Sequence, residues 1–195
     1  MEQRWIQQSI RGDRRAQRRL YDALLPYLRA VCRRYLRDVS YERDALQETF
    51  VRLFRALPSY DAERGSLKAW AAKLAVRAAL NVNERRVDDR VSYPGAEATP
   101  EPVGGNDVDT FTLSDVSDER LLYVLRQMPM GYFEVFNLAV IDGYEHAEIA
   151  ELIDTTAANS RQLLRRARRW LHTHGPQLLQ RYDAAQKTAN HAYGR

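Results

Sequence analysis

An acidic stretch rich in proline and glycine, between residues 87 and 118, most limits what this chain of 195 residues can fold into. Its acidic residues are Asp88, Asp89, Glu97, Glu101, Asp107, Asp109, Asp115 and Asp118, and its one base is Arg90. No helical or strand period runs through it, which predicts a flexible linker over residues 87–114. The chain is thereby divided into a block at 1–86, a second block at 115–174 and a tail at 175–195.

Several classes of protein are excluded by composition and local sequence. The single cysteine, Cys32, cannot form an internal disulfide or a cysteine zinc site, and its apolar surroundings predict a small core residue. No apolar run approaches the roughly 18 residues that a membrane span needs, so no membrane insertion is expected. The N-terminal arginines are followed by no apolar segment, which argues against a signal peptide. We therefore expect a cytoplasmic protein.

The N-terminal block shows the apolar period of helices. Residues from Leu20 to Tyr35 repeat at i, i+3 and i+4, which buries one face of a long helix. Ser40 is expected to cap a second helix that runs over 42–57 and ends before Pro58. Ser66 is expected to cap a third helix over about 67–86, with Trp70 on its core side. Lys73, Arg77 and Asn81 recur four residues apart on the opposite side of that third helix.

The C-terminal block predicts four short helices, over about 119–127, 132–140, 145–153 and 157–172. Asp142 and Gly143 form a turn signal, and Thr156 is a good N-cap for the last helix. The third and fourth helices, joined by so short a connection, predict a helix-turn-helix whose second helix enters the DNA major groove. The expected fold is therefore all-α, with two small helical domains.

The last predicted helix is strongly basic. From Thr155 to Tyr182 there is no acidic residue, while the segment contains Arg161, Arg165, Arg166, Arg168, Arg169 and Arg181. Such a surface beside a helix-turn-helix is an electrostatic footprint for nucleic acid. A solvated basic helix is the alternative. The wider preference for arginine over lysine fits phosphate and base recognition, but GC-rich coding would produce the same bias.

Two segments resemble a known family. YERDALQETFVRLFRALPSYDAERGSLKAWAAKLAVRAALNVNERR resembles the second domain of sigma-70-type RNA polymerase sigma factors, in the extracytoplasmic-function (ECF) group. LRQMPMGYFEVFNLAVIDGYEHAEIAELIDTTAANSRQLLRRARRWL resembles the fourth domain of the same group. The specific parts are Gln47-Glu48-Thr49-Phe50, the Asp-x-x-Arg-Gly turn from Asp61, Gly143 to Ala150, and Arg165 to Arg168. Both domains occur in the family's order, on either side of a linker.

This resemblance implies a factor that binds core RNA polymerase and promoter DNA and directs transcription initiation, with no catalytic residues, no metal and no cofactor. It also implies an anti-sigma factor as a partner. The expected core-polymerase contacts are Asp44, Gln47 and Glu48. The expected −10 contacts are Tyr60, Asp61, Arg64, Ser66, Lys73, Arg77 and Asn81, with Tyr60 stacking on a flipped base. The expected −35 contacts are Thr156, Asn159, Arg161, Gln162, Arg165, Arg166 and Arg168.

The sequence departs from the family pattern in the helix-turn-helix connection, where Asp154 stands in place of the usual glycine. The base preference of the following helix therefore cannot be carried over. Two other classes stay open. One is a stand-alone helix-turn-helix regulator, and the other is a nucleic-acid enzyme that uses Asp44 and Glu48 as metal ligands. A zinc site at His146 and Glu148 is disfavoured, because the cysteines that such a motif requires are missing.

Overall fold

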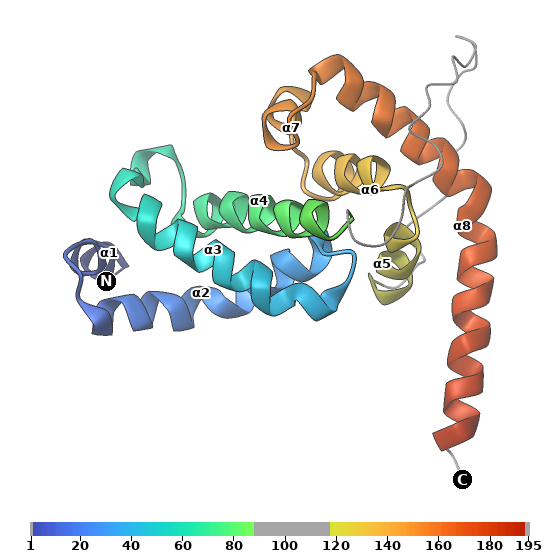
Figure 1. Cartoon of the computed structure of the whole chain (residues 1–195), viewed down its shortest axis with the longest axis horizontal. Coiled ribbons are helices and arrows are strands. Elements are labelled where there is room, and N and C mark those ends of the chain that lie inside the picture. The colour runs from blue at the N-terminus through green and yellow to red at the C-terminus, as the bar shows by residue number, and fades with distance from the viewer. Residues whose placement is uncertain (1, 88–117, 194–195) are drawn as a thin grey trace. The chain divides into compact units, whose positions relative to one another are not determined.

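The computed structural model describes residues 2–87 and 118–193, and these residues form helices without any strand (Figure 1). The chain divides into two compact units, residues 1–92 and 93–195. The all-α prediction is confirmed. The predicted linker falls almost wholly outside the described residues. Within the described ranges, no helix combines the length and hydropathy that a membrane crossing requires.

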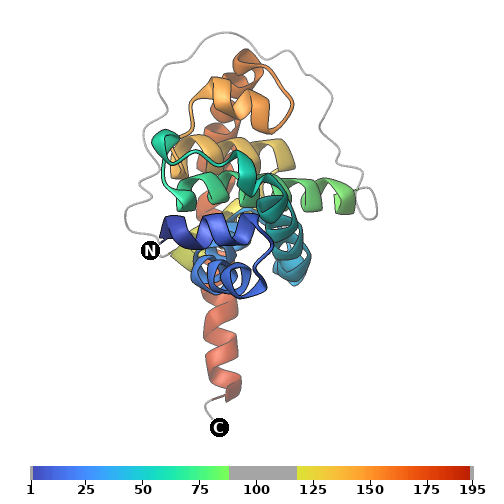
Figure 2. The same cartoon turned by 90° about the vertical axis from the view of Figure 1, so that its left-hand side faces the viewer.

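The described part of the first unit contains four α-helices, and each packs on at least one other. They are α1 (Glu2–Ile10), α2 (Arg14–Tyr35), α3 (Glu42–Ala56) and α4 (Leu67–Val87). α2, α3 and α4 pack on one another, while α1 lies across the first part of α2 (Figure 2). The short α1 therefore closes one end of a three-helix core.

The apolar stripes predicted from the sequence form this core. α2 contributes Leu20, Leu24, Leu28, Val31 and Tyr35, α3 contributes Leu46, Phe50 and Leu53, and α4 contributes Leu67 and a run of alanines and valines. Small residues on α4 let the other two helices approach closely, because alanine adds little to the width of a helix. Trp70, expected on the core side, is only half-buried.

One polar side chain lies inside this core. Asn83 of α4 is 5% exposed. Its Nδ2 donates to the carbonyl of Tyr35 (2.8 Å), and its Oδ1 accepts from the backbone N–H of Arg37 (3.2 Å). Asn83 therefore hydrogen-bonds to backbone groups at and just beyond the end of α2.

The predicted cap of α3 is wrong. Ser40 lies inside a short 3₁₀ turn, Val39–Tyr41, and Asp38 caps that turn by accepting from the N–H of Ser40 at 2.8 Å. α3 then begins at Glu42 without a side-chain cap. An aspartate two residues earlier competes for the same role, and sequence alone does not rank the two.

Cys32 is buried in α2, as the sequence predicts, with its Sγ 3.7 Å from Thr49 Oγ1. Burial raises the pKa of the Cys32 thiol to about 11, and the contact with Thr49 opposes that rise in part. A thiol with a raised pKa in the folded state contributes stability that is complete below its unfolded value, roughly 8.5. That contribution is lost as the pH rises towards about 11.

We therefore expect the free energy of unfolding to fall between roughly pH 8.5 and pH 11, and to fall less steeply in Cys32→Ala. Urea unfolding at several pH values across this window measures both slopes. Alanine lowers the stability at every pH by leaving a small cavity, so the comparison rests on the slope. Equal slopes in the two proteins would show that ionisation of Cys32 has no part in the loss.

The second unit is built around the longest helix. It contains α5 (Asp118–Arg126), α6 (Met130–Phe136), a π-helical turn (Asn137–Ile141), α7 (His146–Leu152) and α8 (Ala157–Tyr193). α5, α6 and α7 all pack on α8. The buried residues include Leu125, Met128, Phe133, Phe136, Leu138, Ile149, Leu164 and Leu171. The four predicted helices are all present.

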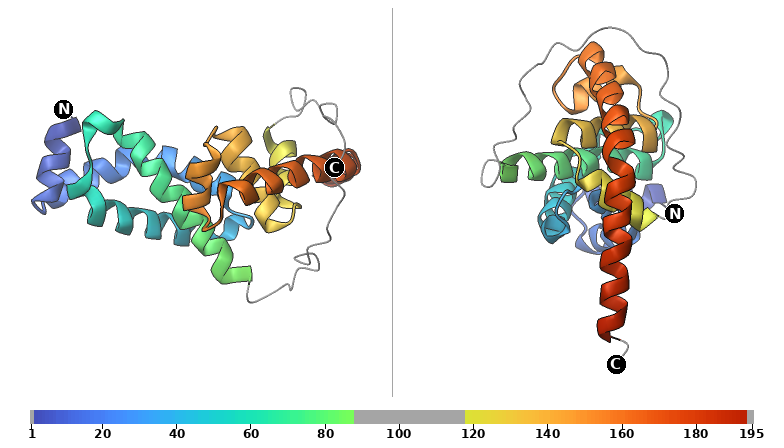
Figure 3. Two further views of the ribbon diagram at one scale, coloured as in Figure 1. Left: turned by 90° about the horizontal axis from the view of Figure 1, so that it is seen from above. Right: turned by 90° about the vertical axis from the view of Figure 1, so that its right-hand side faces the viewer.

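The last predicted helix is much longer than expected. We expected it to end at about His172, but α8 runs on to Tyr193 as one continuous helix (Figure 3). Part of the predicted tail, 175–195, is therefore helical. Tyr182 packs against Tyr123 of α5 (ring centroids 5.2 Å apart), and Asp183 pairs with Arg120 at 2.7 Å.

Gly175 and Pro176 explain the error, since such a pair usually ends a helix. Here Pro176 stays inside the helix, and Gly175 is buried. α8 changes direction along its length (Figure 1), as expected for a proline that lacks an N–H and crowds the preceding turn. The contacts with α5 offset the cost of keeping the proline.

Candidate functional site

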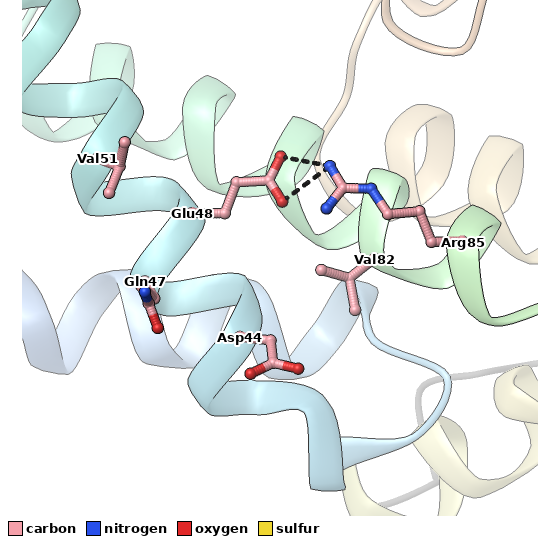
Figure 4. A pocket seen from close by; sticks show the side chains of 6 residues that line it. All are labelled: Asp44, Gln47, Glu48, Val51, Val82 and Arg85. Atoms are coloured by element: carbon pink, nitrogen blue, oxygen red, sulfur yellow. Dashed lines mark hydrogen bonds and ion pairs between the residues drawn. The ribbon is translucent and has the colours of Figure 1, made fainter.

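The residues expected to contact the polymerase line one groove in the first unit. Asp44, Gln47 and Glu48 of α3 face this groove together with Val51, and α4 contributes Val82 and Arg85 (Figure 4). Its volume is about 460 Å³. Asp44 and Gln47 are exposed, because they lie outside the apolar stripe that holds α3 in the core.

Glu48 lies differently from its two neighbours. Its side chain is 17% exposed, and its carboxylate contacts the guanidinium groups of Arg52, one turn along α3, and Arg85 of α4. Arg85 Nη2 lies 3.2 Å from both carboxylate oxygens. The spacing of Glu48 and Arg52 is visible in the sequence. The contact with Arg85 is not, because it joins residues of different helices.

Asn81, one turn after Arg77 on α4, extends this cluster. It is half-buried between α3 and α4, with its amide nitrogen 3.4 Å from Glu48 Oε1. The opposite orientation of the amide satisfies both of its ends: the oxygen accepts from Arg52 Nη2 (2.5 Å), and the nitrogen donates to the Arg77 carbonyl (3.3 Å). Lys73 and Arg77 are exposed.

A second, more apolar groove lies between α2 and α3. Its lining includes Tyr21, Leu25, Leu46, Phe50 and Phe54, and its volume is about 570 Å³. Arg29 and Arg43 line it as well, and so does Glu42, which pairs with Arg29 and Arg33 of α2. Gln47 and Val51 line both grooves, and Val51 is 51% exposed. The outer side of α3 is therefore a continuous surface with a polar groove on one side and an apolar groove on the other.

The loop before α4 is ordered by its own side chains. Asp61 accepts from the N–H of Glu63 (3.0 Å), and Ser66 Oγ accepts from the N–H of Ala69 (3.2 Å), which confirms the predicted cap. The Tyr60 hydroxyl donates to the carbonyl of Gly65 (2.9 Å). Gly65 has a φ of 142°, which a residue with a side chain rarely adopts.

Tyr60 packs on Trp70, with ring centroids 5.4 Å apart. The predicted stacking residue is thus already held in place by a second aromatic ring at the start of α4. Arg64 is exposed on the same loop, and Asp61 and Ser66 are used to shape it. The loop offers a preformed polar surface rather than a chain that must order on binding.

In the second unit, α7 and α8 form the predicted helix-turn-helix. His146 Nδ1 lies 2.9 Å from Oγ of Ser160, which is fully buried, and this contact fixes the start of α7 against the start of α8. Thr156 caps α8 by accepting from the N–H of Asn159 at 3.0 Å. Asn159 Nδ2 donates to Thr155 Oγ1 (2.8 Å), so a bidentate contact with adenine would have to break that bond.

The remaining predicted −35 residues lie on the exposed side of α8, opposite its buried stripe of Ser160, Leu164, Ala167 and Leu171. Arg161, Gln162, Arg165 and Arg168 are exposed, and Arg166 is half-buried. Arg161, Arg165 and Arg168 share one face because they are spaced by four and three residues. This face begins at the helix end that a helix-turn-helix inserts into the groove.

Asp154 supplies the backbone conformation that glycine usually provides. It has a φ of 50°, and Thr155 N–H donates to the Ala150 carbonyl (2.9 Å), which closes α7 as a Schellman motif. The same motif closes α1, where Gly12 (φ 85°) takes this position. Aspartate tolerates the left-handed region better than most residues, so the turn is kept despite the substitution.

We expect Asp154→Gly to stabilise the chain by about 0.5 kcal/mol and Asp154→Val to destabilise it by about 1–2 kcal/mol. The difference arises because valine clashes with its own backbone at a positive φ. Thermal unfolding followed by circular dichroism measures both. Equal midpoints for the two variants would contradict the assigned conformation.

Comparisons with known proteins match both units. The sigma-70 region 2 family model matches residues 20–87, and the sigma-70 region 4 model matches residues 118–171. The ECF RNA polymerase sigma factor SigK of Mycobacterium ulcerans (strain Agy99) is 29% identical over 176 residues, which are 85% of this chain and 89% of that protein. The probable ECF sigma factor SigI of Mycobacterium tuberculosis (strain H37Rv) is 32% identical over 146 residues, 73% of this chain and 50% of that protein.

Among solved structures, the sigma factor RpoE from Bartonella quintana, in complex with the anti-sigma factor NepR, has a TM-score of 0.50 at 18% identity. The match covers 84% of this chain and 96% of that one. At this identity the likeness concerns the fold.

Proposed function

This chain belongs to the sigma-70 family of RNA polymerase sigma factors, in its ECF group, and on that premise we propose how its surfaces divide the work of initiation. The first unit binds core polymerase and the −10 element, and the second unit reads the −35 element. The observation that carries the proposal is that both family regions occur in one chain, each lying within one of its two compact units.

For polymerase binding we propose the exposed side of α3. Asp44 and Gln47 are exposed on this side, where Asp44 lines the polar groove, Gln47 lines both grooves and Val51 adds apolar area. A carboxylate and an amide beside apolar surface suit a basic helical partner, because charge complementarity steers encounter and apolar burial retains the complex. The polar groove between α3 and α4, with a volume of about 460 Å³, is large enough for side chains of a docked helix to enter.

For the −10 element we propose the loop before α4 together with the exposed cations of that helix. Arg64, Lys73 and Arg77 would follow the strand backbone, and Tyr60 would support an extruded base. Extrusion costs a few kcal/mol, which stacking and hydrogen bonds in a preformed pocket must return. The contacts of Tyr60 with Trp70 and Gly65 favour this role, because they order the ring before DNA arrives.

For the −35 element we propose that Arg161, Gln162 and Arg165 reach base edges from the first turns of α8. Arginine reads guanine and glutamine reads adenine in the major groove. Arg166 and Arg168 lie further along the helix and would contact phosphates, which adds affinity without sequence information. The chain performs no catalysis of its own in this scheme and acts in the cytoplasm beside the polymerase.

We also propose an anti-sigma factor as a regulatory partner. The RpoE protein to which this chain is similar in fold is bound to such a factor. The apolar groove between α2 and α3 would accept one face of an amphipathic helix, with Phe50 and Phe54 among the apolar side chains that contact it. An occupant there would also cover Gln47 and Val51, and so would compete with the polymerase.

Transcription in vitro tests the central proposal. Bacterial core polymerase is mixed with a promoter library, with and without this protein, and the start sites are sequenced. New initiation at a defined pair of −10 and −35 sequences is the expected result. Failure to bind core, combined with tight binding to duplex DNA alone, would instead support a stand-alone helix-turn-helix regulator.

A further inference from the structure

The carboxylate of Glu48 is the point at which α3 and α4 are joined by charge. On α4, Arg85 Nη2 lies 3.2 Å from each of its oxygens. Figure 4 shows the Arg85 guanidinium facing the Glu48 carboxylate. Asn81 of α4 also lies beside this carboxylate. On α3 itself, Arg52 contacts the same carboxylate. α3 is the proposed polymerase-binding helix and α4 the proposed DNA-binding helix, so this cluster lies between the two proposed surfaces of the unit.

The exposed fractions of the side chains indicate that Glu48 interacts within the chain and not with a partner. Its side chain is 17% exposed, whereas Arg85 is 64% and Arg52 is 32% exposed. A carboxylate held by two guanidinium groups has its charge compensated within the chain. To contact a basic partner it would have to exchange bonds it already has, with little net gain. Asp44 and Gln47 lie on the same helix and are exposed.

We propose that Glu48 is a positioning residue, which locks α3 onto α4 through Arg85 and makes no contact with the polymerase. The inference rests on the proposed function, because it concerns the two surfaces assigned there. It changes the expectation for Glu48, which the family resemblance places among the polymerase contacts. The consequence is that α4 is held in a fixed position relative to α3 when α3 binds the polymerase. The cluster around Glu48 therefore affects both polymerase binding by α3 and DNA binding by α4.

A double-mutant cycle in the full chain tests this. Glu48→Gln keeps the shape of the side chain and removes its charge, and Arg85→Met keeps the length of the arginine and removes its cation. Affinity for core polymerase is measured by fluorescence titration. Promoter opening is then measured at polymerase concentrations that saturate every variant. The measurement of promoter opening matters because a variant that only binds or folds less well would open the promoter normally once all of it is folded and bound to the polymerase.

We expect each single variant to lower both quantities about threefold, as for a partly exposed ion pair. The double variant should lose no more than the more affected single variant. In the Arg85→Met background, Glu48→Gln should therefore change the affinity or the promoter opening by less than about twofold. This residual effect is expected because Glu48→Gln also removes the ion pair between Glu48 and Arg52 on α3.

Additive losses would overturn the proposal, since a direct contact between Glu48 and the polymerase does not depend on Arg85. A loss in affinity alone, with unchanged opening at saturation, would overturn it as well. Asp44→Asn is the matched control, and it should weaken core binding equally with and without Arg85→Met. If Asp44→Asn has no effect on core binding, the proposal that this side of α3 binds the polymerase is wrong. The proposed link between Glu48 and Arg85 is then still tested by the double-mutant cycle measured on promoter opening.

Discussion

Replacing Arg161 by alanine is expected to weaken binding of the holoenzyme to its promoter by about five- to a hundredfold and to relax specificity at one base pair of the −35 element. Arg161 is exposed in the first turns of α8, at the end that we propose enters the major groove. A bidentate contact of arginine with guanine contributes about 1–3 kcal/mol of discrimination. Binding to promoters that vary at each −35 position measures both effects.

Arg168→Ala is the matched control on the same face of α8, two turns further on. A phosphate contact carries no sequence information, so this variant should weaken binding to all promoters by a similar factor. It should also reduce the slope of log affinity against log salt concentration by about one. If both variants relaxed specificity, or neither did, the assignment of base and phosphate contacts along α8 would be wrong.

Replacing Asn83 by alanine is expected to destabilise the first unit by about 2–4 kcal/mol, and thus to lower its unfolding midpoint by more than about 10 °C. The loss has a specific cause. Without the amide, the buried carbonyl of Tyr35 and the part-buried N–H of Arg37 each lose the hydrogen bond to Asn83. Thermal unfolding of the full chain by circular dichroism measures the change.

Two further variants make the Asn83 prediction specific. Glu84→Ala changes the exposed neighbour and should shift stability by less than about 0.5 kcal/mol. Asn83→Asp keeps the acceptor for Arg37 but buries a carboxylate against the Tyr35 carbonyl, so it should destabilise the unit at least as much as Asn83→Ala. An Asn83→Ala variant as stable as Glu84→Ala would mean that water or backbone movement satisfies the end of α2.

Local sequence rules predicted most of the helices. Apolar spacing placed α2, α3 and α4, and the caps at Ser66 and Thr156 formed as expected, because a cap depends on residues within one turn of it. The same rules failed at two places: before α3 two local capping signals competed, and α8 continues past a local stop signal and packs on α5. Ser40 yielded to Asp38 before α3, and the Gly175-Pro176 pair did not end α8.

The functional residues, too, fall into those that local sequence predicts and those that only tertiary contacts reveal. The sequence by itself determined the two helical blocks, the arginine face of α8 and the acidic side of α3, since periodicity fixes which residues share a helix face. Only the tertiary structure decided that Glu48 faces Arg85, that Asn81 joins that cluster and that Asn83 completes α2. These contacts join residues more than thirty positions apart, and packing alone brings them together.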